Sequence, residues 1–88
     1  MRQRTLMVKN KLGFHARAAA LFVQLANRFD AEVVVCKDSL EANGKSIMGL
    51  LTLAASKGTE VCIKTEGKES EKALAELSDL VNRGFDED

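Results

Sequence analysis

The sequence contains no proline, tryptophan or tyrosine, and its 13 lysines and arginines are balanced by 13 aspartates and glutamates. A general nucleic-acid binder normally carries a basic excess. A surface on which bases stack also needs aromatic side chains, and this chain has only four phenylalanines. The composition therefore argues against nucleic acid as a partner.

Cysteine and long apolar runs are scarce as well. Cys36 and Cys62 are 26 residues apart, whereas metal sites need clustered ligands and small secreted domains usually carry several disulfides. We expect two free thiols buried as small hydrophobic side chains, with no metal and no cofactor. No signal-peptide core precedes Lys9, and the longest uncharged stretch, Ser46 to Ser56, is too short to span a bilayer. A cytoplasmic protein is therefore expected.

The 88 residues are 45% hydrophobic and 30% charged, which is typical of a globular domain. Surface scaling predicts a folded surface of roughly 5,100 Å², enough burial for one core. No internal repeat or low-complexity segment is present. We expect one domain over residues 1–88.

Apolar periodicity predicts the secondary structure. Predicted strands cover residues 4–9, 33–36, 40–42 and 59–65, and predicted helices cover residues 16–29, 46–56 and 70–83. Gly58 and Gly84 are expected to end the second and third helices. The order β-α-β-β-α-β-α predicts an α+β open-faced sandwich, with a four-stranded antiparallel sheet and three helices on one face. Because such layouts serve many functions, the function must be argued from a site.

The only histidine, His15, lies where a strand-to-helix loop becomes the first turn of the first predicted helix. Its ring nitrogen is a nucleophile, and an anion bound there would meet free backbone N–H groups and the positive end of the helix dipole. Arg17 adds a guanidinium suited to phosphate oxygens, and Gly13 lets the loop bend tightly. No carboxylate lies beside His15 in the sequence, so an ordinary capping or surface histidine is the alternative.

Two motifs carry a resemblance to a known family. Residues 12–17 (Leu-Gly-Phe-His-Ala-Arg) closely resemble the active-site signature of HPr, the histidine-containing phosphocarriers of the bacterial phosphoenolpyruvate phosphotransferase system. Residues 44–51 (Gly-Lys-Ser-Ile-Met-Gly-Leu-Leu) resemble the second motif of that family, around its regulatory serine. Chain length, motif spacing and element order also match, so the resemblance covers essentially the whole chain.

The resemblance implies a phosphoryl carrier with no turnover of its own. His15 would accept a phosphoryl group on Nδ1 from phosphorylated enzyme I, which is charged by phosphoenolpyruvate, and pass it to the IIA domain of a sugar permease. Arg17 would bind and orient the phosphoryl group, with the backbone N–H groups of Ala16 and Arg17 stabilising it. Docking of the partner would supply the in-line geometry, which leaves little chemistry to the carrier.

Ser46 is a second site by the same resemblance, because relatives in bacteria with HPr kinase/phosphorylase are phosphorylated at the matching serine. Ser46 also stands at the predicted start of the second helix, where serine is a common N-cap, so capping is the alternative. A phosphate there would be tolerated by the helix terminus. It should weaken binding to enzyme I without unfolding the protein.

An apolar patch for partners is expected next to His15. Met48 and Leu51 fall off the core stripe of the second predicted helix, and with Phe14 and Ile47 they form the predicted partner-binding patch. Methionine suits a surface that fits several partners, although scattered exposed hydrophobic residues are also normal. A carrier that must expose one site to many partners is expected to be a monomer.

Three features depart from the family pattern. Ala18 stands where proline is usual, Phe14 stands where leucine is more usual, and residues 84–88 form an acidic tail slightly longer than in many relatives. Alanine keeps good helix propensity, so the helix should begin at the same place. The tail could be disordered, or it could repel phosphate if it folds near His15.

Two other functions stay open on the sequence. A nitrogen-type paralogue would keep the phosphorelay but serve a regulatory chain instead of sugar uptake. A ferredoxin-like binding module would keep the fold with an inert His15, so that replacing His15 by alanine would change no activity.

Overall fold

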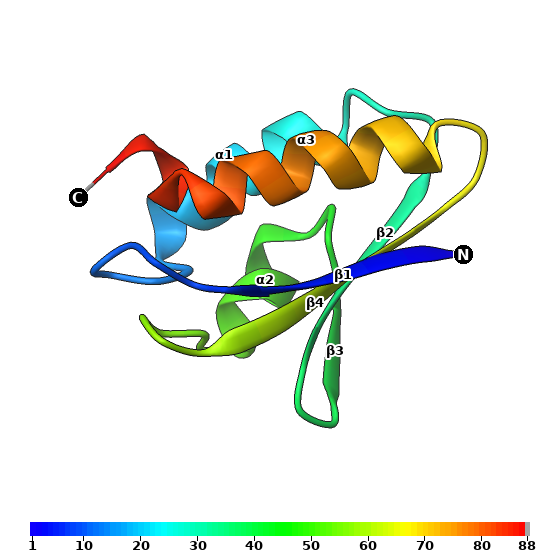
Figure 1. The fold of residues 1–88 in the computed structure, drawn as a ribbon. Coiled ribbons are helices and arrows are strands. Elements are labelled where there is room, and N and C mark those ends of the chain that lie inside the picture. The colour runs from blue at the N-terminus through cyan, green and yellow to red at the C-terminus, as the bar shows by residue number, and fades with distance from the viewer. Residues whose placement is uncertain (88) are drawn as a thin grey trace.

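The computed structural model describes residues 1–87 and contains four strands and three α-helices. The strands are β1 (Arg2–Met7), β2 (Glu32–Lys37), β3 (Leu40–Asn43) and β4 (Glu60–Glu66). The helices are α1 (Ala16–Ala26), α2 (Ile47–Thr52) and α3 (Ser70–Asn82), followed by a 3₁₀ turn, η1 (Gly84–Asp86). All strands pair antiparallel in the order β1-β4-β2-β3, which confirms the predicted open-faced α+β sandwich (Figure 1).

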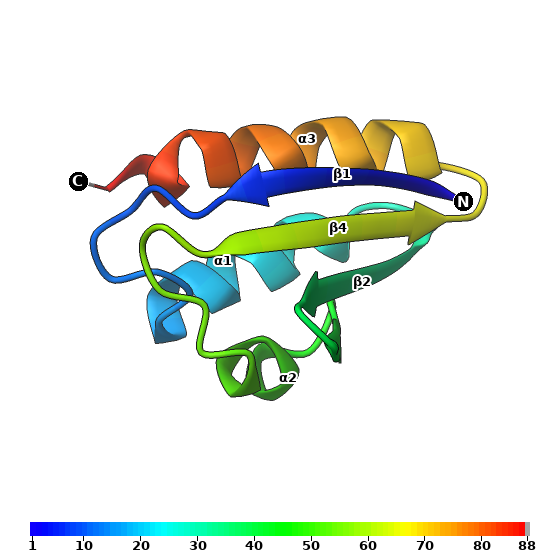
Figure 2. The same cartoon turned by 60° about the horizontal axis from the view of Figure 1, so that its bottom comes forward.

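Alternating side chains divide the sheet into two faces. Val33 and Val35 on β2, with Val61 and Ile63 on β4, are buried beneath the helices. Helix α3 packs on β1 and β4, α1 lies beside α3, and α2 contacts α1 and β3 (Figures 1 and 2). The accessible surface is 5014 Å², close to the value expected from chain length.

The shared direction of β1 and α3 determines where the loop that precedes α1 meets the part of the chain that follows α3. Figure 2 shows that both elements run the same way and finish at the same side of the molecule. The loop that leaves β1 and the residues that follow α3 therefore meet there. Helix α1, which follows that loop, begins at the same side, so the β1–α1 connection and the residues after α3 come together although they are distant in sequence.

Two predicted helices are shorter than expected. Helix α1 ends at Ala26 instead of Phe29, because the N–H groups of Arg28 and Phe29 bond to carbonyls three residues back in a tightened turn. Helix α2 ends at Thr52 instead of Ser56, because Ala54 adopts a left-handed conformation with φ 50°. Ala54 therefore ends the helix in place of Gly58, which lies in a later turn.

The strand boundaries and the last helix differ from the prediction by smaller amounts. Strand β1 covers Arg2–Met7 instead of residues 4–9, because its pairing with β4 starts at Arg2 opposite Thr65. Helix α3 matches the predicted span to within one residue, and Gly84, with φ 65°, follows it as expected. No helix among residues 1–87 is long and apolar enough to cross a bilayer.

Both cysteines are free thiols and Cys36 is buried, as expected, whereas Cys62 is only partly buried. Cys36 and Cys62 are cross-strand partners on β2 and β4. The alternation that points Val35 and Ile63 towards the helices points both cysteines to the opposite face. Burial raises the pKa of the Cys36 thiol, so it stays protonated at neutral pH.

Candidate functional site

His15 is the N-cap residue of α1, and its ring takes no part in capping. The backbone is extended at φ −78° and ψ 178°, and its carbonyl oxygen accepts the Ala19 N–H at 2.8 Å. Within the described residues the side chain makes no capping hydrogen bond. The imidazole therefore stands at the N-terminus of a helix of 11 residues, where the dipole favours an anion.

The loop before His15 is held tightly against the chain that follows α2. Gly13 has φ 63°, and a Cβ there would lie 2.2 Å from the carbonyl oxygen of Ala55, so only glycine fits. The Phe14 N–H donates to the same carbonyl oxygen at 2.9 Å. The turn expected at Gly13 is confirmed, and it fixes the backbone from which the His15 ring projects.

Phe14 lies in the core, which corrects its assignment to the exposed partner patch. Its side chain is only 4% exposed. The ring centroid is 5.7 Å from that of Phe22 on α1 and 5.2 Å from that of Phe85 in η1. Aromatic rings bury large areas and pack well edge to face, so burial is favoured over exposure. Phe14 thus anchors the loop to both α1 and the tail.

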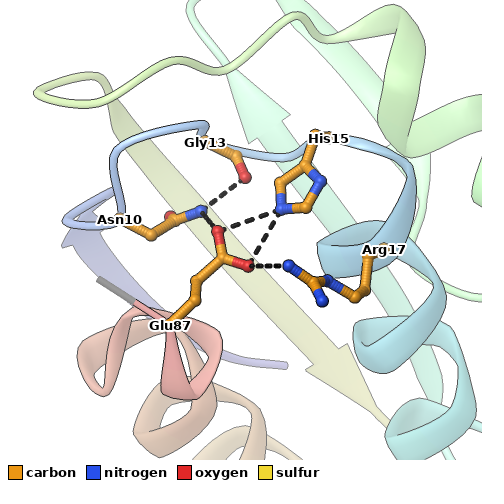
Figure 3. Close-up of polar contacts among 5 residues, drawn as sticks. All are labelled: Asn10, Gly13, His15, Arg17 and Glu87. Carbon is orange, nitrogen blue, oxygen red and sulfur yellow. Dashed lines mark hydrogen bonds and ion pairs between the residues drawn. The ribbon is translucent and has the colours of Figure 1, made fainter.

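Glu87 places a carboxylate against the His15 ring, which no sequence pattern near His15 predicted. His15 Nε2 lies 2.9 Å from Oε1 and 3.1 Å from Oε2 of Glu87, which is 72 residues away in the chain (Figure 3). A guanidinium nitrogen of Arg17 lies 3.6 Å from Oε2. The acidic tail therefore folds onto the histidine, one of the two outcomes considered for it; Asp88 lies outside the described residues.

Asn10 orients the Glu87 carboxylate. Its side chain is fully buried, and its Nδ2 donates to the Gly13 carbonyl oxygen at 2.7 Å and to Glu87 Oε1 at 2.8 Å (Figure 3). This amide hydrogen bond is the main reason that the pKa of Glu87 lies below its ordinary value. His15 and Arg17 lower that pKa further, while partial burial opposes them.

The structure brings His15 and Arg17 together as predicted, but around a carboxylate. The Arg17 side chain is 72% exposed, so its guanidinium has room to reorient. Helix α1 begins at Ala16 with alanine at position 18, where the sequence predicted. Sequence reasoning missed Asn10, a short polar residue without a motif, and it noted the acidic tail without placing Glu87.

Ser46 and the exposed part of the patch lie at the start of α2. The Ser46 hydroxyl oxygen accepts the Gly49 N–H at 3.0 Å, which confirms the predicted N-cap. The Ile47 and Met48 side chains are 40% and 73% exposed, whereas Leu51 packs partly against the core. Of the predicted patch, Ile47 and Met48 are thus exposed, Leu51 is partly buried and Phe14 is buried.

Comparison with known proteins decides the family. The model described as "PTS HPr component phosphorylation site" matches residues 2–83. The chain belongs to the HPr family. A phosphocarrier protein HPr from Neisseria meningitidis serogroup B is 46% identical over 87 residues, which cover 99% of this chain and 98% of that protein. The family resemblance seen in the two motifs is thus confirmed over nearly the whole chain.

Solved HPr structures share the fold over the whole chain. HPr-C-His from Thermoanaerobacter tengcongensis is 44% identical, with a TM-score of 0.96 and coverage of 100% of this chain and 99% of that one. Crh, described as a catabolite repression protein of Bacillus subtilis and as a domain-swapped dimer, is 46% identical, with a TM-score of 0.78 and coverage of 96% and 97%. The HPr fold therefore occurs in a dimer as well.

Proposed function

We propose that His15 accepts a phosphoryl group on Nδ1 from phosphorylated enzyme I and passes it to the IIA domain of a sugar permease. The observation that carries the proposal is the position of the ring. It stands at the N-terminus of α1, unused for capping, with Nε2 turned to Glu87 and Arg17 close by. Nδ1 has no partner among residues 1–87, so it is the nitrogen available to an incoming phosphoryl group.

The site would act by stabilising the negative charge of the phosphoryl group. The Ala16 and Arg17 N–H groups and the helix dipole stabilise the phosphoryl oxygens, each such term contributing about 0.3–1 kcal/mol when exposed. The Arg17 guanidinium, now 3.6 Å from Glu87, reorients to pair with those oxygens. The phosphoryl group is stabilised but stays exposed to the next acceptor, and the carrier has no turnover alone.

The test is phosphorylation from phosphoenolpyruvate. The protein is incubated with phosphoenolpyruvate and a bacterial enzyme I, and its intact mass is compared with that of a His15→Ala variant shown to be folded by circular dichroism. We expect one acid-labile phosphoryl group, absent from the variant. No addition with several enzyme I proteins would refute the carrier function for this chain. Addition to the variant would show that His15 is the wrong acceptor.

Ser46 is proposed as the regulatory phosphorylation site, acted on by HPr kinase/phosphorylase. Its place beside the exposed Ile47 and Met48 and the likeness to the catabolite repression protein Crh support this role. Ser46→Asp tests the effect, because aspartate is also a good N-cap and adds charge without removing the cap. We expect about tenfold weaker binding to enzyme I, with the urea midpoint changed little. Unchanged affinity would refute the regulatory role.

A cytoplasmic monomer is proposed as the working form. Phosphoenolpyruvate and ATP, the phosphoryl sources of the two reactions, support the location. Light scattering tests the oligomeric state directly, and a stable dimer like that of Crh would overturn the proposed monomer.

The likeness to Crh also keeps a regulatory branch open as an alternative recipient of the phosphoryl group. Transfer to a regulatory IIA domain, with none to a sugar IIA domain, would favour that alternative.

A further inference from the structure

Cys36 and Cys62 face each other across two neighbouring strands. They are direct partners in the antiparallel register of β2 and β4, and both stand on the sheet face opposite the helices. The same register row continues to Thr5 on β1 and to Glu41 on β3. The two free thiols therefore occupy the middle of a row that crosses all four strands.

The register gives the two cysteines a separation that a disulfide can span. Directly opposed residues in an antiparallel pair have Cα atoms about 4.5–5.5 Å apart, and disulfides join Cα atoms about 4.4–6.8 Å apart. Opposed side chains also leave the sheet on the same face, so both Sγ atoms are directed to one side. A bond between Cys36 and Cys62 therefore requires no sliding of β2 against β4.

The two thiols differ in their access to solvent. Lys64 Nζ on β4 and Glu41 Oε2 on β3 approach to 3.7 Å, and because β2 lies between those strands, this ion pair crosses β2 beside Cys36. Cys36 is accordingly only 9% exposed, and its Sγ donates to Glu41 Oε2 at 3.7 Å. Cys62 is only partly buried. Cys62 is therefore the thiol that an oxidant in solution meets first.

We propose that Cys36 and Cys62 form a reversible redox site, which closes to a disulfide between β2 and β4 under a peroxide and reopens with a thiol reductant. An accessible cysteine beside a second, resolving cysteine is the arrangement of redox-sensing thiols. No group of three potential metal ligands occurs among residues 1–87, which favours a disulfide over a zinc site. In a reducing compartment such a disulfide is transient and forms only on oxidation.

The reaction balances with hydrogen peroxide as the oxidant. The ionised Cys62 Sγ bonds to one peroxide oxygen while the O–O bond breaks, and the departing hydroxide takes up the proton that Cys62 released and leaves as water. Cys36 Sγ then bonds to the sulfenic Cys62 Sγ, and the sulfenic hydroxyl leaves as water with the Cys36 proton. Two thiols and one peroxide thus give one disulfide and two waters, with two electrons passed from sulfur to oxygen.

Peroxide treatment of the folded protein tests the proposal. The reduced protein is treated with hydrogen peroxide, and its intact mass and its alkylation after denaturation are compared with those of Cys36→Ser and Cys62→Ser. We expect a monomer about 2 Da lighter, with both thiols protected from alkylation and restored by dithiothreitol. Cys36→Ser should instead carry a sulfenic acid that dimedone traps. Thiols that stay free in the parent protein, that oxidise to sulfinic acid or that link two copies would overturn the proposal.

An equilibrium with glutathione separates a pair placed by the fold from two thiols that meet by chance. The sheet sets the register only in the folded state, so the equilibrium constant for disulfide formation should be about tenfold larger, or more, in the folded protein than in the urea-unfolded chain. The oxidised protein should correspondingly unfold at a higher urea concentration than the reduced protein. A constant that is equal or smaller in the folded protein would overturn the inference.

Discussion

Individual residues hold the His15 loop because their backbone and packing leave few alternatives. Gly13 combines a left-handed conformation with a close approach to Ala55, and Phe14 inserts its ring between Phe22 and Phe85. The histidine between this anchor and α1 is thereby held without using its own side chain. Rigidity of this kind suits a group that must meet a partner in line.

Replacing Gly13 by alanine should both destabilise the protein and slow phosphoryl acceptance, because the new Cβ would overlap the Ala55 carbonyl oxygen. Gly58→Ala is the matched control: its φ is 88°, but nothing among residues 1–87 lies within 4 Å of the added Cβ. We expect a loss of about 1 kcal/mol for Gly58→Ala from backbone strain alone, and about 1–3 kcal/mol more for Gly13→Ala. Urea denaturation measures the loss of stability in each variant, and equal losses in the two variants would contradict the steric argument.

At the scale of elements, the ends of the helices decide where the functional groups lie. Ser46 caps the start of α2 and Ala54 turns the chain just after its end, so the helix is short and presents Ile47 and Met48 outward. The chain beyond Ala54 then supplies the Ala55 carbonyl oxygen that receives the Phe14 N–H. The early end of α2 thus contributes directly to the His15 loop.

Ala54→Gly should stabilise the protein, because glycine adopts φ 50° without the steric cost that alanine bears. The gain should be about 0.5–1 kcal/mol, since greater freedom of the unfolded chain offsets part of the relief. Ala75→Gly on the exposed side of α3 is the control and should lose about 1 kcal/mol, as glycine does in a helix interior. Thermal and urea unfolding measure both changes. A loss in both variants would show that Ala54 is not strained.

At the scale of the whole molecule, the contact between Glu87 and His15 joins the residues that follow α3 to the start of α1. It exists because β1 and α3 run in the same direction and finish together (Figure 2). The pKa of Glu87 is lowered by folding, so the folded protein binds that proton more weakly than the unfolded chain. The corresponding stability is present above the ordinary pKa of 4.5 and is lost as the pH falls through the lower folded value.

The difference in unfolding free energy between the parent protein and Glu87→Gln should therefore narrow as the pH is lowered below 4.5. Urea titrations of both proteins over a series of acidic pH values measure this difference. Asp86→Asn serves as the control, because it removes a tail carboxylate that faces Arg83 instead of His15. A difference that stays constant down to complete acid unfolding would contradict the linkage.

The sequence by itself determined the fold class, the order of elements, the His15–Arg17 pair and the Ser46 cap. Periodicity, capping residues and motifs act over a few neighbouring positions, so they are visible in one chain. The tertiary structure decided the rest: Phe14 is buried, both cysteines lie on the face opposite the helices, and Asn10 and Glu87 meet His15. Those contacts depend on strand alternation and on the shared direction of β1 and α3, which bring together groups up to 77 residues apart.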